Sequence, residues 1–505
     1  MAVRARLAVQ QPDRQEWKWH AVPSVSLPVS TLFGGDRRME AEAYLLGGYG
    51  LRTAIEARPD GWIAFEQLAK VWQPSRLKGI QVSSEYGTPF LAATQVFDVR
   101  PTPRKWLALE RTEQADQRFV DAGTLLVTCS GAVGRATLAY APHLNILISH
   151  DLLRVHPLES KYAGWLYAYL RAPTTYAMMT SAQYGHVVKH LETSHLNALP
   201  IPKLPDSLLA SFSERTRAIL DRRNDAYAAT KAAEDRFTTV IGMATGTVSP
   251  TGFAVNSSDL FESRRRLESS FHAPAAQAIL AHFSASGLTT EPLSGVTDGV
   301  WWLTRFARVF GDEGAPYMSA DDLFSINPTV DKRVIVEQAD NADQYFLKNG
   351  WIAMVCSGQA YGLLGSVALM TSGQEHIFFS HDLIRIRPRT ELIRPGYLFT
   401  VLGHPALGRP LVIRYAYGTS IPHLEPKDVA TFPVVRLSSD DENYIADNAE
   451  QAARWRAEAD QLENALANDA ERILTRFIAG EPLEEHAIQL PLLPPHESLQ
   501  ILPKP

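Results

Sequence analysis

Two histidine–aspartate pairs have the side chains that catalysis or metal binding would require. His150-Asp151 and His381-Asp382 each follow a serine and precede a leucine. An imidazole beside a carboxylate can transfer protons or bind a metal ion, but neither strand-like segment brings further ligands to its pair. We therefore interpret both pairs as structural, with capped side chains, and we expect neither a catalytic residue nor a metal site in this chain.

Two Ser-Gly turns point to a different chemistry, the binding of phosphate. Ser130-Gly131 and Ser357-Gly358 both follow a cysteine and carry little side-chain bulk. Such a turn can bring backbone N–H groups and a hydroxyl close to a phosphate oxygen. A tight turn without any ligand explains the same residues equally well, so both interpretations stay open on sequence alone.

The segments that hold these residues occur twice, in the same order. Residues 123–131 match residues 350–358, which lie 227 positions later, and 149–157 is nearly copied in 380–388. The other matching blocks are Gly87-Thr-Pro89-Phe90 with Gly314-Ala-Pro316-Tyr317, Ala115-Asp116-Gln117 with Ala342-Asp343-Gln344, Gly185 with Gly418, His190-Leu191-Glu192 with His423-Leu424-Glu425, and Pro200-Ile201 with Pro433-Val434. Because so many blocks remain collinear, the sequence predicts a duplicated domain.

Each copy reads as a mixture of short strands and helices. Short β runs precede and follow each Cys-Ser-Gly turn, and another opens at each Ser-His-Asp block. The segments 165–170 and 397–402 lack helix breakers and predict a helix after each of those blocks. The predicted fold class is therefore α+β, with an irregular sheet in each copy.

A long helix is predicted after each copy. Residues 206–241 and 441–479 contain neither proline nor glycine, and their apolar residues recur with the coiled-coil period. A surface helix packed on its own domain is the alternative, but each helix should span on the order of 50 Å, more than a compact domain covers. We predict that the two helices pair as an antiparallel coiled coil. The predicted contacts are Leu209, Phe212, Ile219, Phe237, Ile445, Trp455, Leu462, Leu466 and Ile473.

Composition limits the class of protein further. The 505 residues are 45% hydrophobic and 21% charged, which excludes a disordered or collagen-like chain. Two cysteines cannot form a disulfide framework and lack the neighbours of a zinc site, so we expect a cytoplasmic protein without an export signal. Residues 351–370 are uncharged and close to the length of a membrane span. Their glycines and the repeat instead predict strand, turn and strand, with no membrane association.

Together these features resemble the specificity (S) subunit of type I restriction-modification enzymes over nearly the whole chain. The resemblance rests on the Gly-x-Leu/Ile-x4-Ser-Gly turn, on the ending Leu199-Pro200-Ile201-Pro202, and on a long helix after each domain. The second half departs from the pattern, because it ends in Phe432-Pro433-Val434-Val435 and its turn has one more residue before Gly362.

The resemblance implies a function and a domain order. Each of two target-recognition domains would read one half of a split double-stranded DNA target in bacterial defence against foreign DNA. The paired helices would set the gap and hold two adenine-N6 methyltransferase (M) subunits, which would bind SAM, with or without restriction/translocase (R) subunits. This chain itself would bind no cofactor. The implied parts are an N-terminal arm (1–16), recognition domain 1 (17–205), spacer helix 1 (206–245), recognition domain 2 (257–437), spacer helix 2 (440–480) and a disordered Pro-rich tail (481–505).

Net charge must be reconciled with DNA binding. The chain carries −6, but the residues from Asp440 onward carry −9, so residues 1–439 carry +3. A weak affinity fits a subunit whose partners also contact phosphate, since the number of neutralised phosphates sets the salt-dependent part of binding. Basic clusters, for which a solvated surface is the alternative, lie at Arg37-Arg38, 100–111, Arg264-Arg265-Arg266 and 305–308.

The loops that differ between the copies are the candidate readers of base sequence. Residues 183–186 and 415–420 hold matching positions but carry different aromatic and polar side chains. Residues that read different half-sites should differ at such positions. The predicted DNA contacts are Ser130, Gly131, Arg135, Gln183, Tyr184, His186, Lys189, Arg305, Arg308, Ser357, Gly358, Tyr415, Tyr417, Thr419 and Ser420.

Two other functions stay open. The sequence contains no Asn/Asp-Pro-Pro-Tyr/Phe tetrapeptide of an adenine methyltransferase, no Gly-x4-Gly-Lys loop for ATP and no convincing nuclease constellation, so we expect no chemistry from this chain. One alternative is an assembly scaffold that no longer reads DNA. The other is the recognition part of a single-chain restriction-methylation enzyme, which the length opposes because both halves are already occupied.

Overall fold

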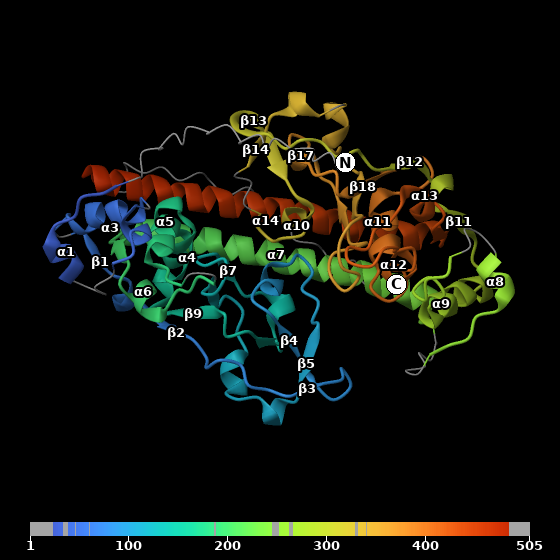
Figure 1. The fold of residues 1–505 in the computed structure, drawn as a ribbon, viewed down its shortest axis with the longest axis horizontal. Helices are drawn as coiled ribbons and strands as arrows, with labels where there is room; N and C mark the ends of the chain where they lie inside the picture. Colours follow the sequence, from blue (N-terminus) through green and yellow to red (C-terminus); the bar gives the residue numbers. More distant parts are fainter. Residues whose placement is uncertain are drawn as a thin grey trace, which may run out of the picture.

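The computed structural model describes residues 24–33, 39–45, 47–59, 61–185, 188–244, 252–261, 266–328, 332–339 and 341–483. In this part of the chain, two long helices run along the longest axis, the first half lies to the left of and below them, and the second half lies to the right and above (Figure 1). The predicted segments and residues that fall outside the described part of the chain are the arm (1–16), the tail from 484 onward, His186, Arg37-Arg38 and Arg264-Arg265.

The two long helices are α7 (Asp206–Ile241) and α14 (Ser439–Ala479), and they pack against each other as predicted. They run in opposite directions, because Arg215 pairs with Asp469 near the end of α14, whereas Arg236, later in α7, pairs with Asp441 near its start. The first helix stops short of the predicted boundary at 245. Gly242 ends it with a φ of +83°, which leaves the helical region.

The predicted apolar stripes are buried, and they make two kinds of contact. At the middle of the pair, Ala226 and Ala229 pack against Ala452 and Trp455, where small side chains permit a close approach. Toward the ends, the stripes enter the cores of both halves. Leu209, Phe212, Ile219, Leu462, Leu466 and Ile473 belong to the core of the first half, and Phe237 and Ile445 belong to that of the second. Helix pairing and packing on the domains therefore occur together.

The first half is built on short strands from distant parts of the sequence. One antiparallel sheet has the order β2 (Ala69–Trp72), β9 (Leu152–Pro157), β6 (Leu125–Thr128), β7 (Ala136–Leu138). Another has the order β3 (Gln81–Val82), β5 (Lys105–Leu107), β4 (Thr88–Leu91), β8 (Leu147–Ile148), with β4 and β8 parallel. The strands β1 (Trp62–Ala64) and β10 (Pro200–Pro202) pair antiparallel beside them.

Within the described residues, the second half repeats this strand order, except that its second sheet has three strands in place of four. Its four-stranded sheet is β12 (Thr297–Trp301), β18 (Leu383–Pro388), β15 (Ile352–Val355), β16 (Val367–Leu369). Its second sheet is β14 (Arg333–Val334), β13 (Phe310–Met318), β17 (Phe378–Phe379), again with one parallel pair, β13 and β17. The strands β11 (Thr290–Pro292) and β19 (Pro433–Val435) pair as β1 and β10 do. The uncharged stretch 351–370 is thus strand, turn and strand, as predicted.

Shorter helices complete both halves, and α4 and α11 contact both long helices. The first half contains α1 (Val29–Phe33), α2 (Glu42–Leu45), α3 (Gly48–Glu56), α4 (Ala163–Arg171), α5 (Pro173–Ala182) and α6 (Thr193–Asn197). The second contains α8 (Ser257–Phe261), α9 (Pro274–Ala285), α10 (Ala320–Leu323), α11 (Pro395–Gly403), α12 (Arg409–Ile413) and α13 (Pro426–Val429). Among the residues described, no helix is both long enough and apolar enough to cross a bilayer.

One glycine in each half lets a short helix lie directly on a long one. A Cβ at Gly164 of α4 would stand 2.4 Å from the backbone of Phe212 in α7, and a Cβ at Gly396 of α11 would stand 2.5 Å from the carbonyl oxygen of Ala446 in α14. No real side chain tolerates such distances. The two halves are therefore docked on the helix pair by the same device.

A buried group of charges joins α7 to α14. Arg223 donates to Asp460 (2.8 Å) and to Glu463 (2.5 Å), and the Tyr167 hydroxyl of α4 also donates to Glu463. Burial acts to raise the pKa of the Glu463 carboxyl, but the charges of Arg223 and Arg171 and the hydrogen bonds from Arg223 and Tyr167 together hold this pKa below its ordinary value. Removing one member of such a group leaves an uncompensated charge in the interior.

The substitution Arg223→Ala should lower the free energy of unfolding by about 3 to 5 kcal/mol, because it leaves the Glu463 carboxylate buried without its partner. Arg217→Ala, at an exposed position of the same helix, should change this free energy by less than about 0.5 kcal/mol. Urea denaturation followed by circular dichroism measures both variants. Equal effects would show that the buried charges contribute nothing to the helix pair.

Candidate DNA interface

Three loops singled out in the sequence lie together in the first half. They are the turn 129–134, the His-Asp turn 149–151 and the loop 183–191, which is described except for residues 186 and 187. We call them the three-loop cluster of the first half. Its backbone hydrogen bonds run from the Gly131 N–H to the Lys189 carbonyl (2.9 Å), from the Leu191 N–H to the Cys129 carbonyl (2.9 Å) and from the Cys129 N–H to the Asp151 carbonyl (3.0 Å).

The second half contains an equivalent three-loop cluster, made of the turn 356–365, the His-Asp turn 380–382 and the loop 415–424. Its bonds run from the Gly358 N–H to the Pro422 carbonyl (3.1 Å), from the Leu424 N–H to the Cys356 carbonyl (2.9 Å) and from the Cys356 N–H to the Asp382 carbonyl (3.1 Å). The sequence blocks that match between the copies therefore converge at one place in each half.

The Ser-Gly turns hold their glycine N–H groups in internal bonds. Gly131 and Gly358 both take a positive φ, +76° and +138°, and both donate to carbonyls within their own cluster. The Ser357 hydroxyl also lies 2.7 Å from Nδ1 of His423. A phosphate bound by the glycine N–H groups would have to break these bonds. The structure thus favours the tight-turn interpretation over phosphate binding by these two N–H groups.

Each aspartate of the His-Asp turns is held by the serine two residues before it. The Ser149 hydroxyl donates to Oδ2 of Asp151 at 2.9 Å and accepts the Asp151 N–H at 3.2 Å. Ser380 and Asp382 repeat both bonds at the same distances. Within the described residues there is no group of three or more side chains that could hold a metal ion. The serine therefore orients each carboxylate.

A buried arginine supports each His-Asp turn from the neighbouring strand. Arg154 donates to the carbonyls of Ile148 (3.0 Å), Ser149 (2.9 Å) and Leu152 (2.5 Å). Its counterpart Arg385 donates to two equivalent carbonyls. Burial lowers the pKa of each guanidinium to about 10, so both remain charged at neutral pH and the carbonyl oxygens compensate that charge.

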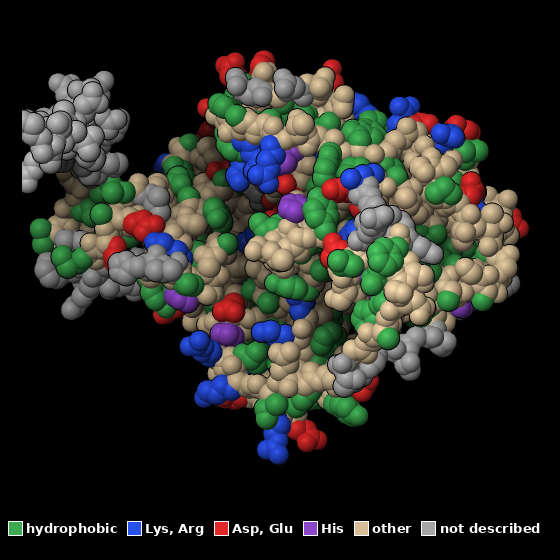
Figure 2. All heavy atoms as spheres, turned by 45° about the vertical axis from the view of Figure 1, so that its right-hand side comes forward, with side chains coloured by type: hydrophobic (Ala, Val, Ile, Leu, Met, Phe, Trp, Pro, Cys, Tyr) green, Lys and Arg blue, Asp and Glu red, His purple; other side chains and the backbone are tan. Residues whose placement is uncertain are grey.

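Arginines also surround the two histidines. Burial lowers the pKa of both imidazoles, and nearby arginines add to this effect, so both rings are neutral at pH 7. Those arginines include Arg76 and Arg118 beside His150, and Arg305 and Arg308 beside His381. Figure 2 shows Lys and Arg side chains with His side chains beside them on both the upper and the lower part of one face.

The cysteine thiols of the clusters are unsuited to nucleophilic chemistry. Burial raises the pKa of the Cys129 thiol to about 12 and that of the Cys356 thiol to about 11. A thiol attacks as its thiolate, and neither group forms a thiolate at neutral pH.

Several predicted contacts lie at the surface of the clusters. Tyr184 is 37% exposed and its hydroxyl donates to Glu192 (2.7 Å). Thr419 and Ser420 are exposed, Arg305 is exposed, and Arg308 lies 3.4 Å from Asp382. Lys189 is partly buried and pairs with Glu42. Among the other predicted residues of these loops, Gly131 is exposed, and the partly buried ones are Ser130, Gln183, Ser357, Gly358, Tyr415 and Tyr417.

Arg135 lies elsewhere. Its guanidinium stands 4.2 Å from the centre of the Phe97 ring and donates to the Ile326 carbonyl (3.3 Å), a residue of the second half. The structure thus places Arg135 at a junction between the halves and not with the exposed residues of the cluster.

Two residues beside the three-loop cluster of the first half were not predicted from the sequence. Gln73 donates from its side-chain amide to the His150 carbonyl (2.7 Å), and Arg76 is an exposed cation near the same histidine. The strands β2 and β12 hold equivalent positions in the two copies, so residue 76 corresponds to residue 304 or 305 of the second half. If the alignment of the two copies had been extended toward the N-terminus, the predicted contact Arg305 would therefore have pointed to Arg76 as its counterpart.

No family model and no curated protein matches this chain. Among solved structures, it is similar to the type I restriction-modification S subunit from M. genitalium, at 13% identity and a TM-score of 0.31, over 84% of this chain and 94% of that one. It is similar to the HsdS subunit from Thermoanaerobacter tengcongensis at 13% identity and a TM-score of 0.24, over 84% and 98% of the chains. The type IIG restriction endonuclease BpuSI matches 35% of this chain and 28% of its own, at 14% identity and a TM-score of 0.25.

S subunits of type I restriction-modification systems are thus structural neighbours over most of this chain. Since none of these TM-scores reaches 0.5, we base the functional proposal on the contacts of the chain itself.

The substitution Arg154→Met should lower the free energy of unfolding by about 2 to 4 kcal/mol, because it leaves three buried carbonyls without a donor. Lys70→Met, at an exposed position of the adjacent strand β2, serves as the matched control and should be nearly neutral. Guanidinium denaturation gives the stability, and hydrogen exchange of residues 148–152 reports the local effect. Unchanged exchange in that turn would show that Arg154 does not support it.

Proposed function

We propose that this chain is the DNA-recognition subunit of a restriction-modification complex, in which each half reads one part of a bipartite double-stranded target. The observation that carries the proposal is the recurrence of the three-loop cluster. The same backbone bonds, serine-held aspartates and neighbouring arginines occur in both halves, while the surface side chains differ. One framework with two sets of surface residues suits two half-sites of different sequence.

The helix pair gives these two clusters a geometry that fits the proposal. Because α7 and α14 run in opposite directions, each half packs on the end of one helix and the start of the other. The halves are thus related approximately by a two-fold axis across the helix pair. Dimeric DNA readers use the same relation to match half-sites at a fixed spacing.

The proposed subunit needs partner subunits that methylate or cut the DNA. We propose two adenine-N6 methyltransferase subunits, which bind SAM, with or without restriction/translocase subunits, in the cytoplasm of a bacterium. Burial raises the pKa of both cluster thiols, and a serine holds each aspartate carboxylate. Both features suit a surface that binds DNA and supplies no nucleophile of its own. An assembly scaffold remains the second candidate, because the paired helices alone would support it.

Deleting the chain from cells that keep the methyltransferase should remove N6-methyladenine from one bipartite motif. Single-molecule sequencing of the host DNA measures this loss. Exchanging residues 17–205 for those of another such subunit should alter one half of the motif and leave the other half intact. An unchanged methylome would reject DNA recognition, and substitutions at Tyr184 and Tyr417 that leave the motif intact would favour the scaffold.

Arg76→Ala and Arg305→Ala should each weaken binding to specific and unrelated duplexes alike, because a phosphate contact carries no base information. Each should also reduce the slope of log affinity against log salt concentration by about 1. Fluorescence anisotropy of the chain with its methyltransferase, from 50 to 200 mM salt, is the measurement. Arg454→Ala, at an exposed position of α14, is the control. A slope unchanged from that control would place Arg76 and Arg305 away from the phosphates.

A further inference from the structure

Two equivalent segments of the halves pair with each other. Residues 97–99 of the first half and 324–326 of the second occupy the same positions in the repeat, 227 residues apart, and they form an antiparallel bridge at Asp98 and Ser325. The hydrogen bonds of this pairing run from the Val99 N–H to the Phe324 carbonyl (2.8 Å) and from the Ile326 N–H to the Phe97 carbonyl (2.7 Å). We call this pairing the tie.

The tie is symmetric in its residues. Val99 corresponds to Ile326 and Phe97 corresponds to Phe324, so each hydrogen bond repeats the other with the halves exchanged. A contact made by the same patch from both sides is isologous, as at the interface of a two-fold dimer, and it closes on itself. The local two-fold axis therefore passes between Asp98 and Ser325.

Side chains reinforce the tie on both sides. Ile326 of the second half is 3% exposed and lies within a hydrophobic cluster of the first half, together with Phe97. Arg135 covers the Phe97 ring and donates to the Ile326 carbonyl. The next residue, Asn327, donates its N–H to Asp460 of α14 (2.9 Å). The contact is thus continuous with a core and with the helix pair.

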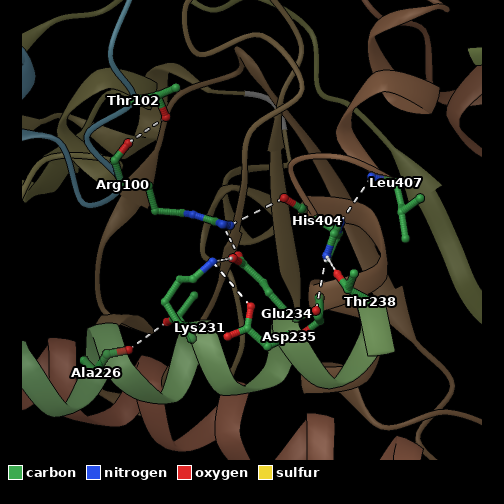
Figure 3. Close-up of polar contacts among 12 residues, drawn as sticks. Arg100, Thr102, Ala226, Lys231, Glu234, Asp235, Thr238, His404 and Leu407 are labelled. Atoms are coloured by element: carbon green, nitrogen blue, oxygen red, sulfur yellow. Dashed lines mark hydrogen bonds and ion pairs between the residues drawn. The ribbon is translucent and has the colours of Figure 1, made fainter. Parts of the chain in front are cut away.

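Arg100, which directly follows the tie, links three parts of the molecule. Its guanidinium reaches Glu234 of α7 and the Gly403 carbonyl at the end of α11 (3.5 Å). His404, the next residue, lies 2.9 Å from the Thr238 hydroxyl of α7. Figure 3 shows Arg100 extending toward Glu234 between Lys231 and His404. The first half, α7 and the second half therefore meet at the guanidinium of Arg100.

The helix pair alone leaves the separation of the halves partly free. Long helices bend gently, and a half docked only at one end of them can move with that bend. The tie adds a direct bond between the halves near their common axis, so the distance and angle between the two three-loop clusters no longer depend on helix stiffness alone. A fixed separation of two readers fixes the number of base pairs between their half-sites.

We propose that the tie, together with Arg100, is the element that restricts this chain to one spacing between its two half-sites. This inference rests on the proposed function, because only a DNA reader has half-sites to space. It assigns a role in specificity to residues that contact no base. Loosening the tie should change which gaps are accepted and leave the sequence of each half-site as it was.

The contact itself can be tested without DNA, through the double variant Asp98→Cys/Ser325→Cys. The two positions form a non-hydrogen-bonded antiparallel pair, in which Cα atoms lie about 4.5 Å apart, within the range of a disulfide. Mild oxidation should join them, as a shift on non-reducing electrophoresis and a linked peptide by mass spectrometry. Each single-cysteine variant is the control, since Cys129 and Cys356 are buried. A double variant that does not cross-link would overturn the inference at its first step.

The effect on spacing is measured with the methyltransferase partner, on duplexes whose half-sites lie at the native gap or one base pair closer or farther apart. The loosened variant Arg100→Ala/Ile326→Ala should methylate the altered duplexes at least tenfold more, relative to the native gap, than the wild type does. The oxidised Asp98→Cys/Ser325→Cys chain should keep the native preference. Lys348→Ala, at an exposed position away from the tie, should behave as wild type.

The outcomes separate this inference from the function on which it rests. A loosened variant that still methylates only the native gap would overturn the role of the tie and leave DNA recognition intact. A wild-type chain that directs no methylation to a bipartite site would reject the proposed function, whereas the cross-linking result would still decide whether the halves are joined.

Discussion

The ion pairing between α7 and α14 is the constraint on which the rest of the structure depends. Arg223 lies between Asp460 and Glu463, and both carboxylates bind further groups, since Glu463 accepts from Tyr167 of the first half and Asp460 accepts from the N–H of Asn327 in the second. A shift of one helix along the other would therefore misplace both halves at once. Because unpaired charges are costly in the interior, the helix pair has one favourable register.

Carboxylates of α14 also hold two shorter helices, α5 and α11, by their N-termini. The N-terminus of α5 donates to Glu471 through the N–H of Thr174 (2.8 Å) and through its hydroxyl (2.7 Å), and the N-terminus of α11 donates to Glu450 through the N–H of Gly396 (3.1 Å). Carboxylates favour helix N-termini because free N–H groups and the helix dipole point toward them. The acidic residues of α14 thus bind one helix of each half, which places the two clusters at defined positions along one rod.

The features that could be predicted from sequence are those that depend on spacing along the chain. The duplication predicted the recurring strand order, and the uninterrupted stripes predicted both long helices and the burial of residues such as Phe212 and Trp455. Features that depend on a distant partner could not be predicted. No pattern in the sequence indicates that Arg135 donates to the Ile326 carbonyl, 191 positions away. Likewise, none indicates that the Gly131 N–H donates to the backbone of another loop.

The polarity of the helix pairing has a consequence for fragments and for copies of the chain. The ion pairs that Arg215, Arg222, Arg223 and Arg236 make between the two helices all place arginine on α7 and a carboxylate on α14. Two copies of α7 would bring arginines together, and two copies of α14 would bring carboxylates together, so like-charge repulsion opposes both associations. Without this difference in charge, the long helix of either half could pair with the same helix of a second copy of the chain. Unequal charge on two otherwise similar helices thus favours the folded single chain over a dimer of identical halves.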